Sequence, residues 1–441
     1  MKAVTRTVDA FLGIILALIS VSYLFVREHL WAIAIIAPAY ILVNLLPGIF
    51  DPDAEGTRLR LLKHGAVVVI NMLFASVVSV AYHVYLAFAL LPDGYKTLLW
   101  SAVYSVCFLA LSLAGGIFFM YVTSAQLRVK WRVLGIVFGL IFPVNLLILG
   151  FMLEITLREV SFESMRIRRN AERSDREVCK TKYPVLLVHG FFFRDWPLFN
   201  YWGRIPKELE ANGAAIYYGN HQSARPVPDS ARELARRIRD IVEDTGCERV
   251  NVIAHSKGGV DMRYALQHLG IAPLVASLTT VSTPHRGCIF AERLLEKIPK
   301  DVQLKVASAY NGTLRLLGDD NPDFLAAARD LTASVCTERD SYPVPEGVYA
   351  RSVGSHQKKA HYGRFPLNLS YHLVKYYDGL NDGMVALDSF EWGEEYTLVE
   401  PVGRRGISHG DMIDLNRENI KDFDVREFYV GLVSSLKDRG L

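Results

Sequence analysis

Five long apolar runs fill the first third of the 441-residue chain, and they limit what this part can fold into more than any other feature. Each run could cross a hydrocarbon core of about 30 Å as a helix, and each is nearly free of charge. Core helices of a water-soluble protein explain five such runs poorly, and a cleaved signal peptide would explain only the first. We therefore predict a bundle of five transmembrane helices within residues 1–155. The runs cover residues 8–26, 30–49, 65–91, 98–125 and 131–153.

Lysine and arginine in the short connections indicate the orientation of such a bundle, because cytoplasmic loops carry an excess of them. They concentrate at the N-terminus and in the second and fourth connections. Five crossings from an inside N-terminus then place the C-terminal part outside the cell membrane. An arginine-rich run directly after the last apolar run favours the opposite side, so the reversed orientation stays open. Its arginines are Arg158, Arg166, Arg168, Arg169, Arg173 and Arg176.

Residues 156–182 form a charged segment of mixed sign that contains neither glycine nor proline. This composition predicts a helical linker that lies along the membrane surface. A solvated spacer between two domains is the alternative.

The composition argues against several kinds of function. A net charge of +3 is too small to indicate nucleic-acid binding. The five cysteines are scattered without a CxxC pair, so neither a zinc site nor a disulfide framework is indicated.

His83 lies inside the third apolar run, where polar groups are often functional. A histidine that faces a neighbouring helix explains it as well, so we place no site there. The lack of charge in the runs also argues against a transporter path for polar solutes.

From residue 183 the pattern changes to short apolar runs that alternate with amphipathic stretches. Residues 231–242 carry their apolar side chains on one face of a helix with a period of 3.6. Strands that alternate with helices predict a mostly parallel sheet covered by helices on both faces over 183–441. In such sheets the functional site lies at the carboxyl ends of the strands. The expected strands are 184–188, 214–218, 250–254, 277–281, 348–353 and 396–400.

The segment 251–259, NVIAHSKGG, joins one of these buried strands to a helix through a tight turn. This is the setting of the nucleophile elbow G-x-S-x-G, whose strained turn exposes a serine. The positions two before and two after the serine must be small, and Ala254 and Gly258 meet that need. Ser256 is therefore the candidate nucleophile. A serine on an ordinary turn between a strand and a helix is the alternative.

A second strand end carries the sharp turn His189-Gly190-Phe191. A turn of this kind can aim a backbone N–H at a substrate carbonyl. We expect the N–H groups of Phe191 and Lys257 to form an oxyanion hole, in which each donor typically contributes about 3 kcal/mol. A plain glycine turn is the alternative.

A serine nucleophile needs a histidine base and an orienting acid, which follow in the order serine, acid, histidine in α/β hydrolases. Asp382 is the favoured acid, because the glycine beside it permits a tight turn. His409, in a loop after the last expected strand, is the favoured base. Three rivals exist, and the histidine among them precedes the acid and has the wrong order. They are Asp378, Asp388 and His372. We expect His285 to support a strand end above the site.

Seven segments resemble, in the same order, the bacterial true lipases of the α/β-hydrolase superfamily, notably the secreted Gram-positive branch. The resemblance covers roughly 181–441 and leaves the apolar third unexplained. It implies the α/β-hydrolase fold and the hydrolysis of carboxylic esters, usually acylglycerols, by Ser256, Asp382 and His409. The segments are PVLLVHGF (184–191), YWG (201–203), AHSKGG (254–259), STPHRG (282–287), DLT (330–332), NDG (381–383) and SHGD (408–411).

The same resemblance implies two further features. Members of this group require no cofactor but often bind a structural calcium, and Asp411 matches one ligand position, two residues after the histidine. We identify no other calcium ligand, and no counterpart of the zinc site that some members carry. Members also have a mobile lid, and residues 288–340 are expected to form it. A plain helical insertion is the alternative.

The sequence thus predicts a membrane-anchored serine ester hydrolase that acts on acyl-ester lipids. Its parts are a transmembrane domain (1–155), a linker (156–182) and a hydrolase domain (183–441). Two alternatives stay open. One is an acyltransferase or lipid deacylase with the same triad, and the other is a non-catalytic membrane scaffold that has an α/β-hydrolase-like domain.

Overall fold

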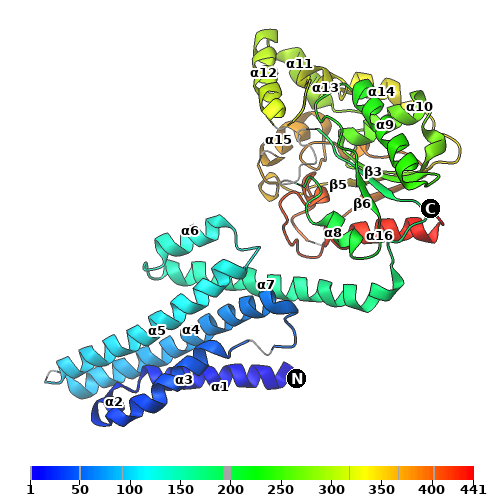
Figure 1. Ribbon diagram of the computed structural model, residues 1–441. Helices are drawn as coiled ribbons and strands as arrows, with labels where there is room; N and C mark the ends of the chain where they lie inside the picture. Colours follow the sequence, from blue (N-terminus) through cyan, green and yellow to red (C-terminus); the bar gives the residue numbers. More distant parts are fainter. Residues whose placement is uncertain are drawn as a thin grey trace. The chain divides into compact units, whose positions relative to one another are not determined.

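The computed structural model describes residues 2–48, 51–91, 93–191, 200–316, 318–365, 367–400 and 403–441. The chain divides into two compact units, Met1–Glu172 and Arg173–Leu441 (Figure 1). The first unit is helical, and the second contains all six strands. Each unit has its own buried apolar cluster.

The first unit consists of seven helices in its described residues, of which α4 (35 residues) and α5 (29 residues) pack on each other. These two helices are long and apolar enough to cross a membrane, as judged by their length and composition over the described part of the chain. The helices are α1 (Lys2–Ser20), α2 (Tyr23–Glu28), α3 (Ile33–Leu45), α4 (Gly56–Leu90), α5 (Tyr95–Thr123), α6 (Val129–Phe138) and α7 (Val144–Arg173), and a short 3-10 helix covers Leu30–Ala32.

The predicted bundle of five membrane-spanning helices is not confirmed. The first apolar run is divided between α1 and α2, and the second contains a helix of 13 residues with Pro38 inside it. The last residue of that second run, Ile49, lies outside the described residues. The fifth run is divided between α6 and α7, with Pro143 between them. Proline has no N–H and interrupts the hydrogen bonds of a helix, so an apolar composition did not ensure one continuous span.

A buried carboxylate organises one end of the first unit. Glu159 of α7 is 1% exposed and pairs with Arg58 of α4 at 2.5 Å. Its oxygens also accept hydrogen bonds from the hydroxyl of Ser124 (2.6 Å) and the N–H groups of Ala125 and Gln126 (3.0 Å each). A buried charge needs such partners to offset its desolvation. This carboxylate therefore connects α4, α7 and the loop after α5, in the first part of the predicted linker segment.

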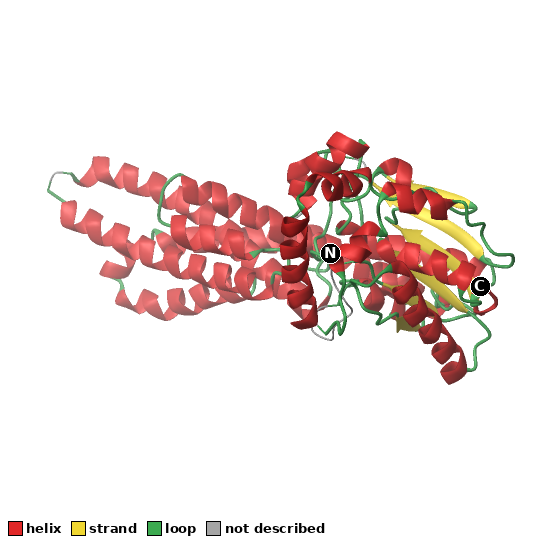
Figure 2. Cartoon of the chain, turned by 90° about the horizontal axis from the view of Figure 1, so that it is seen from above, coloured by secondary structure: helices red, strands yellow, loops and turns green. Residues whose placement is uncertain are grey.

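The second unit is built on a sheet of six parallel strands in the order β2-β1-β3-β4-β5-β6. Figure 2 shows the strands of this unit in yellow, with helices around them. All six expected strands are present, which confirms the predicted parallel α/β sheet. Val188 pairs with Ala254 and His255 with Val281, so that β1, β3 and β4 end side by side. The strands are β1 (Val185–Val188), β2 (Ile216–Tyr218), β3 (Val250–His255), β4 (Val275–Val281), β5 (Tyr349–Ser355) and β6 (Glu395–Val399).

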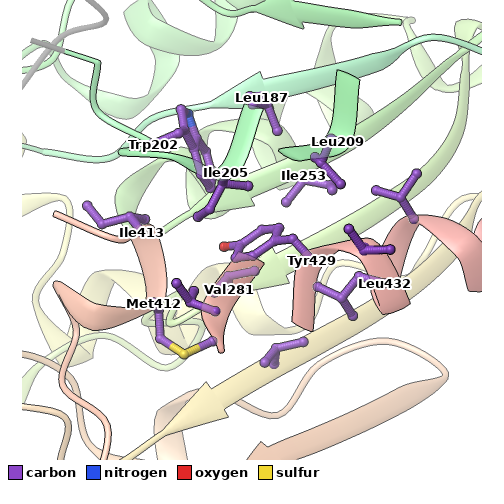
Figure 3. Close-up of a cluster of buried hydrophobic side chains, with 14 of the residues drawn as sticks. Leu187, Trp202, Ile205, Leu209, Ile253, Val281, Met412, Ile413, Tyr429 and Leu432 are labelled. Atoms are coloured by element: carbon purple, nitrogen blue, oxygen red, sulfur yellow. The ribbon is translucent and has the colours of Figure 1, made fainter. Parts of the chain in front are cut away.

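Alternate strand residues face opposite sides of the sheet, and each side is covered by a pair of helices. Leu187 and Ile253 face α8 (Ile205–Glu210) and α16 (Val425–Asp438), with Tyr429 packed between them (Figure 3). Their sequence neighbours face α9 (Val227–Thr245) and α10 (Lys257–His268). Helices on both faces are typical of the α/β-hydrolase fold, as predicted.

The amphipathic helix expected at 231–242 is the central part of α9. Its first turn contains a proline, and Gly246 ends it in the left-handed region at φ 68°. Proline fits the first helical turn because its missing N–H has no partner there, and glycine adopts a positive φ without strain. Local signals therefore extend this helix beyond its periodic core.

Four helices occupy the predicted lid segment between β4 and β5. Of these, α13 contacts both α11 and α12, and α14 contacts α11 (Figure 1). The helices are α11 (Ile289–Lys297), α12 (Lys300–Leu316), α13 (Phe324–Arg329) and α14 (Ala333–Asp340), and α15 (Leu367–Asp378) follows β5. We refer to α11–α14 as the cap. Short 3-10 helices cover Ser174–Arg176, Ala272–Leu274, Ala360–Tyr362, Leu387–Ser389 and Asp411–Ile413.

Candidate active site

Ser256 lies at the turn between β3 and α10 in a strained backbone conformation, with φ 54° and ψ −129°. A non-glycine residue rarely adopts such a positive φ, and strain of this kind gathers at functional sites. The N–H of Ser256 donates a hydrogen bond to the carbonyl of Val281 (2.9 Å), which fixes the turn to the end of β4. A strained serine between a strand and a helix is the geometry expected of a nucleophile elbow.

Close backbone contacts around the elbow require small residues. A Cβ at Gly258 would collide with the carbonyl oxygen of His189, and a Cβ at Gly190 would lie 2.8 Å from the Cβ of Ser256. The first turn of α10 therefore packs directly on the end of β1. The two strand ends that we expected to supply oxyanion donors are neighbours.

Asp382 and His409 form a buried hydrogen-bonded pair. The Nδ1 of His409 lies 2.7 Å from Oδ2 of Asp382, whose side chain is fully buried. The other oxygen of Asp382 accepts hydrogen bonds from the N–H groups of Met384 (3.0 Å) and Val385 (2.8 Å). A carboxylate held in this way orients the imidazole so that Nδ1 donates and Nε2 can accept a proton.

The rival acids and the rival histidine lie elsewhere. The carboxylate of Asp378 accepts hydrogen bonds from the N–H groups of Ile289 and Phe290 (2.8 Å each) at the start of α11. Asp388 and His372 are exposed. These contacts assign Asp378 to the N-terminus of a cap helix and leave Asp382 as the carboxylate that meets His409.

His285 supports the end of β4, as expected from the sequence. Its Nε2 lies 2.9 Å from the hydroxyl of Thr280, its Nδ1 lies 3.1 Å from Arg263, and its ring stacks on Trp392. Burial, followed by the charges of Arg263 and Arg286, holds the pKa of His285 well below its ordinary value. The imidazole is therefore a neutral packing element.

One residue for which the sequence predicted no role lies beside His409. The ring of His255 is 4.5 Å from the ring of His409, and its Nδ1 lies 2.7 Å from the hydroxyl of Tyr201. Burial and the neighbouring His409 hold the pKa of His255 well below its ordinary value, so that its ring is neutral. This ring contact places the imidazole of His409 next to His255, the residue that directly precedes Ser256. Its position next to the serine was the only sequence signal for this role.

The two expected oxyanion donors belong to neighbouring elements. Phe191 follows β1 and is buried, and Lys257 is the first residue of α10. The N–H groups at the start of a helix carry a partial positive charge, which favours an anion. Residues 192–199, which follow Phe191, lie outside the described residues.

An apolar cavity of about 300 Å³ extends from Ser256 into the cap. Its walls come from the ends of β1 and β4, from α11, α12 and α13, and from the residues that follow Asp382. Lining side chains include Phe191, Pro284, Ala291, Leu294, Leu331 and Val385. A cavity lined by carbon atoms favours an acyl chain over a polar substrate.

The residues around Asp411 do not fit a calcium site. The Oδ2 of Asp411 accepts hydrogen bonds from the N–H (2.9 Å) and hydroxyl (2.7 Å) of Ser408. Its Oδ1 lies 3.2 Å from the guanidinium of Arg405, which also contacts Glu418 at 3.2 Å. Calcium requires six to eight oxygen ligands, and an arginine already meets these two carboxylates. No group of three or more His, Cys, Asp or Glu side chains that could hold a metal occurs in the part of the chain described.

Sequence comparison finds relatives that are named triacylglycerol lipase. A triacylglycerol lipase of Pseudarthrobacter phenanthrenivorans is 34% identical over 177 residues, which are 37% of this chain and 54% of that protein. A triacylglycerol lipase of Burkholderia plantarii is also 34% identical over 177 residues, which are 49% of its length. Triacylglycerol lipase 2 of Saccharomyces cerevisiae is 29% identical over 304 residues, which are 62% of this chain and 80% of the yeast protein. The chain spans about half the length of the first two relatives. No protein-family model matches the chain.

Among solved structures, a mature lipase of Bacillus licheniformis covers 57% of this chain and 92% of its own length, at 20% identity and a TM-score of 0.43. A metagenomic carboxyl esterase covers 59% of this chain and 76% of its own length, at 15% identity and a TM-score of 0.44.

Proposed function

We propose that this chain is a membrane-anchored serine ester hydrolase that cleaves carboxylic esters of acyl lipids through an acyl-enzyme. The observation that carries the proposal is the 2.7 Å hydrogen bond between Asp382 and His409, which lies beside the strained turn of Ser256. The apolar cavity that reaches Ser256 supports an acyl substrate. The relatives named triacylglycerol lipase support an ester of a lipid.

In the acylation half-reaction, the Oγ of Ser256 attacks the carbonyl carbon of the ester while Nε2 of His409 takes the hydroxyl proton. The carbonyl oxygen becomes an oxyanion that accepts hydrogen bonds from the N–H groups of Phe191 and Lys257. Asp382 stabilises the imidazolium through Nδ1. The C–O bond to the alcohol then breaks, and His409 returns the proton to the leaving alkoxide, which departs as an alcohol.

In the deacylation half-reaction, water replaces the alcohol. His409 removes a proton from the water as its oxygen attacks the acyl carbon, and the same two N–H groups hold the second oxyanion. The bond from the acyl carbon to Ser256 then breaks, and His409 gives the proton to Oγ. The products are a carboxylic acid and the regenerated serine. The cap would shield the acyl-enzyme from bulk water.

The first unit supplies the membrane anchor in this proposal. α4 and α5 have the required length and apolar composition. The finer prediction of five crossings, with the hydrolase unit outside the cell membrane, belongs to the same proposal. An anchored hydrolase would work where acyl esters are concentrated, which suits an apolar substrate cavity.

The test is labelling of the full chain with a fluorophosphonate, together with hydrolysis of a p-nitrophenyl ester. We expect label on Ser256 and ester turnover, and we expect both to disappear in Ser256→Ala. Ser282→Ala is a matched control, because Ser282 also has a positive φ (49°) at a strand end but does not line the cavity. A folded Ser256→Ala protein that still turns over the ester would exclude the elbow. No label on folded wild type would leave the scaffold alternative.

A further inference from the structure

A buried ion pair lies directly behind the proposed nucleophile. The ammonium of Lys257 contacts both oxygens of Asp261, at 2.8 and 2.9 Å, and the hydroxyl of Ser230 at 3.0 Å. The side chains of Lys257 and Asp261 are 1% and 0% exposed. Desolvation of two charges is costly, and apolar residues of the same size often stabilise a core as well or better. A general contribution to stability therefore explains this pair poorly.

The ion pair and Ser230 connect α9 with the start of α10, directly after Ser256. Lys257 and Asp261 lie one turn apart on α10, and Ser230 belongs to α9. The same residue that supplies the ammonium also supplies the backbone N–H at the start of α10. A side chain held from two helices limits rotation of its own backbone, so the direction of that N–H is restrained.

The network continues to the other half of the oxyanion hole. Oδ2 of Asp261 lies 3.8 Å from Nε2 of His221. The ring of His221 stacks on the ring of His189, with 3.9 Å between centroids and 10° between planes. The ring nitrogens of His189 lie 2.9 Å from the carbonyl oxygens of His221 and Gly190. This series of contacts from Asp261 therefore ends at Gly190, one residue before Phe191.

We propose that Lys257, Asp261 and His221 are positioning residues that hold the N–H groups of Phe191 and Lys257 at a fixed separation. This inference rests on the proposed ester hydrolysis. Oxyanion donors act only when they point at the oxygen of the transition state without rearrangement. A polar network of fixed geometry restrains direction, whereas an apolar contact of the same volume restrains only distance. The side chains of these residues do not meet the substrate, so their effect is on the rate of the chemical step.

The experiment measures kcat and KM for a p-nitrophenyl ester in the full chain and in Lys257→Met, Asp261→Asn and the double variant. Active sites are counted by fluorophosphonate titration, so that kcat refers to folded sites. Each single variant is expected to lower kcat per site at least 10-fold, with KM within 3-fold of wild type. The kcat of the double variant is expected to be no lower than that of the less active single variant, because both substitutions remove the same interaction. Ser230→Ala removes one contact of the ammonium, and a 2- to 5-fold loss of kcat is expected.

Arg351→Met is the matched control, since it removes a buried cation that contacts Thr279, Leu432 and Ser435 and not the elbow. It is expected to lower the melting temperature and to leave kcat per site within 2-fold. The proposal is wrong if the two single variants, the double variant and Ser230→Ala all keep kcat per site within 2-fold of wild type. It is equally wrong if Arg351→Met loses as much kcat as Lys257→Met, because a general loss of packing would then explain the effect. An inactive, unlabelled wild type would instead overturn the proposed function on which the inference rests.

Discussion

At the scale of single residues, the environment of Asp382 distinguishes it from the other candidate acids. Three aspartates lie within a few positions of one another, and only Asp382 is fully buried against His409. Its second oxygen is held by the backbone N–H groups of Met384 and Val385. These hydrogen bonds fix the direction in which the carboxylate faces the imidazole of His409.

Replacing Asp382 with asparagine should lower kcat for ester hydrolysis by about 10⁴-fold, because the amide no longer stabilises the required imidazole tautomer. The measurement is the steady-state rate per fluorophosphonate-titrated site. Asp388→Asn, at an exposed position a few residues away, serves as the control and should stay within 2-fold of wild type. A greater loss in Asp388→Asn or Asp378→Asn would show that the acid is assigned to the wrong residue.

Asp261 predicts a pH dependence of stability. Burial raises its pKa to about 6; the charge of Lys257 opposes this shift and that of Asp330 adds to it. His221 and Arg339 are the other ionisable groups that face it. An unfolded aspartate titrates near 3.9. Between these values the folded state keeps a proton that the unfolded state has lost, so the contribution of this group to stability is full at low pH and is lost as pH rises through about 6.

Asp261→Asn removes this titration. The free energy of unfolding of wild type relative to that of Asp261→Asn should therefore fall by up to about 3 kcal/mol between pH 4 and pH 7. Urea unfolding of both full-length proteins at these two pH values measures the change. A difference that stays constant with pH would mean that Asp261 titrates normally in the folded protein.

At the scale of elements, the cap shapes the substrate cavity. Phe324 of α13 stacks on Phe191 (5.2 Å between centroids) and on Tyr310 of α12 (4.6 Å). These aromatic contacts connect the end of β1 with two cap helices. Asp378 of α15 connects a third, since it holds the first N–H groups of α11. Small movements of the cap would therefore alter the cavity, which fits a gating role.

Replacing Ala291 of α11 with tryptophan should shift the preference of the enzyme toward short acyl chains, because Ala291 lines the cavity of about 300 Å³. A methylene that no longer fits an apolar pocket typically costs 1–3 kcal/mol of discrimination, or about 10- to 200-fold in kcat/KM. The measurement compares kcat/KM for a four-carbon and a twelve-carbon p-nitrophenyl ester. Leu304→Trp, at a position on α12 that is 61% exposed, is the control and should leave the ratio unchanged. An unchanged ratio in Ala291→Trp would place the acyl chain elsewhere.

At the scale of the whole molecule, the chain combines a helical unit with an α/β unit. The exposed side chains of α4 and α5 are largely apolar, among them Val77, Phe88, Val106 and Phe118. Large exposed apolar surfaces mark contact with a membrane or with another protein. In the proposed function, this surface would contact a lipid bilayer, and the apolar cavity of the second unit would hold an acyl chain.

The full chain should stay in the membrane fraction after extraction with alkaline carbonate, since transmembrane helices are held by burial of apolar surface and not by charge. A membrane-impermeant fluorophosphonate should label Ser256 in intact cells. Labelling of the same cells after lysis is the control for a reactive site. Extraction by carbonate would exclude spanning helices, and labelling only after lysis would reverse the predicted orientation.

The sequence by itself determined the architecture of the second unit. Short apolar runs that alternate with amphipathic stretches predicted all six strands, because side-chain periodicity follows directly from backbone geometry. Local steric rules also predicted the strained turn at Ser256, since such a turn needs small residues two positions before and after the serine, here Ala254 and Gly258. Only two of five apolar runs form helices of spanning length and composition in the described residues. Hydropathy records composition, and it does not show where proline or a turn interrupts a helix.

Only the tertiary structure decided which side chains meet. The loop that contains Asp382 does not by itself reveal which of three nearby carboxylates reaches His409, because contact between distant loops depends on how the sheet and cap pack. The same limit applies to Asp411, which matches a calcium ligand in sequence but meets Arg405 in space. It applies most strongly to Lys257: its backbone was expected at the oxyanion hole, but its buried pairing with Asp261 depends on the fold. Burial determines the desolvation free energy of a charged group, and burial is a property of the packed chain.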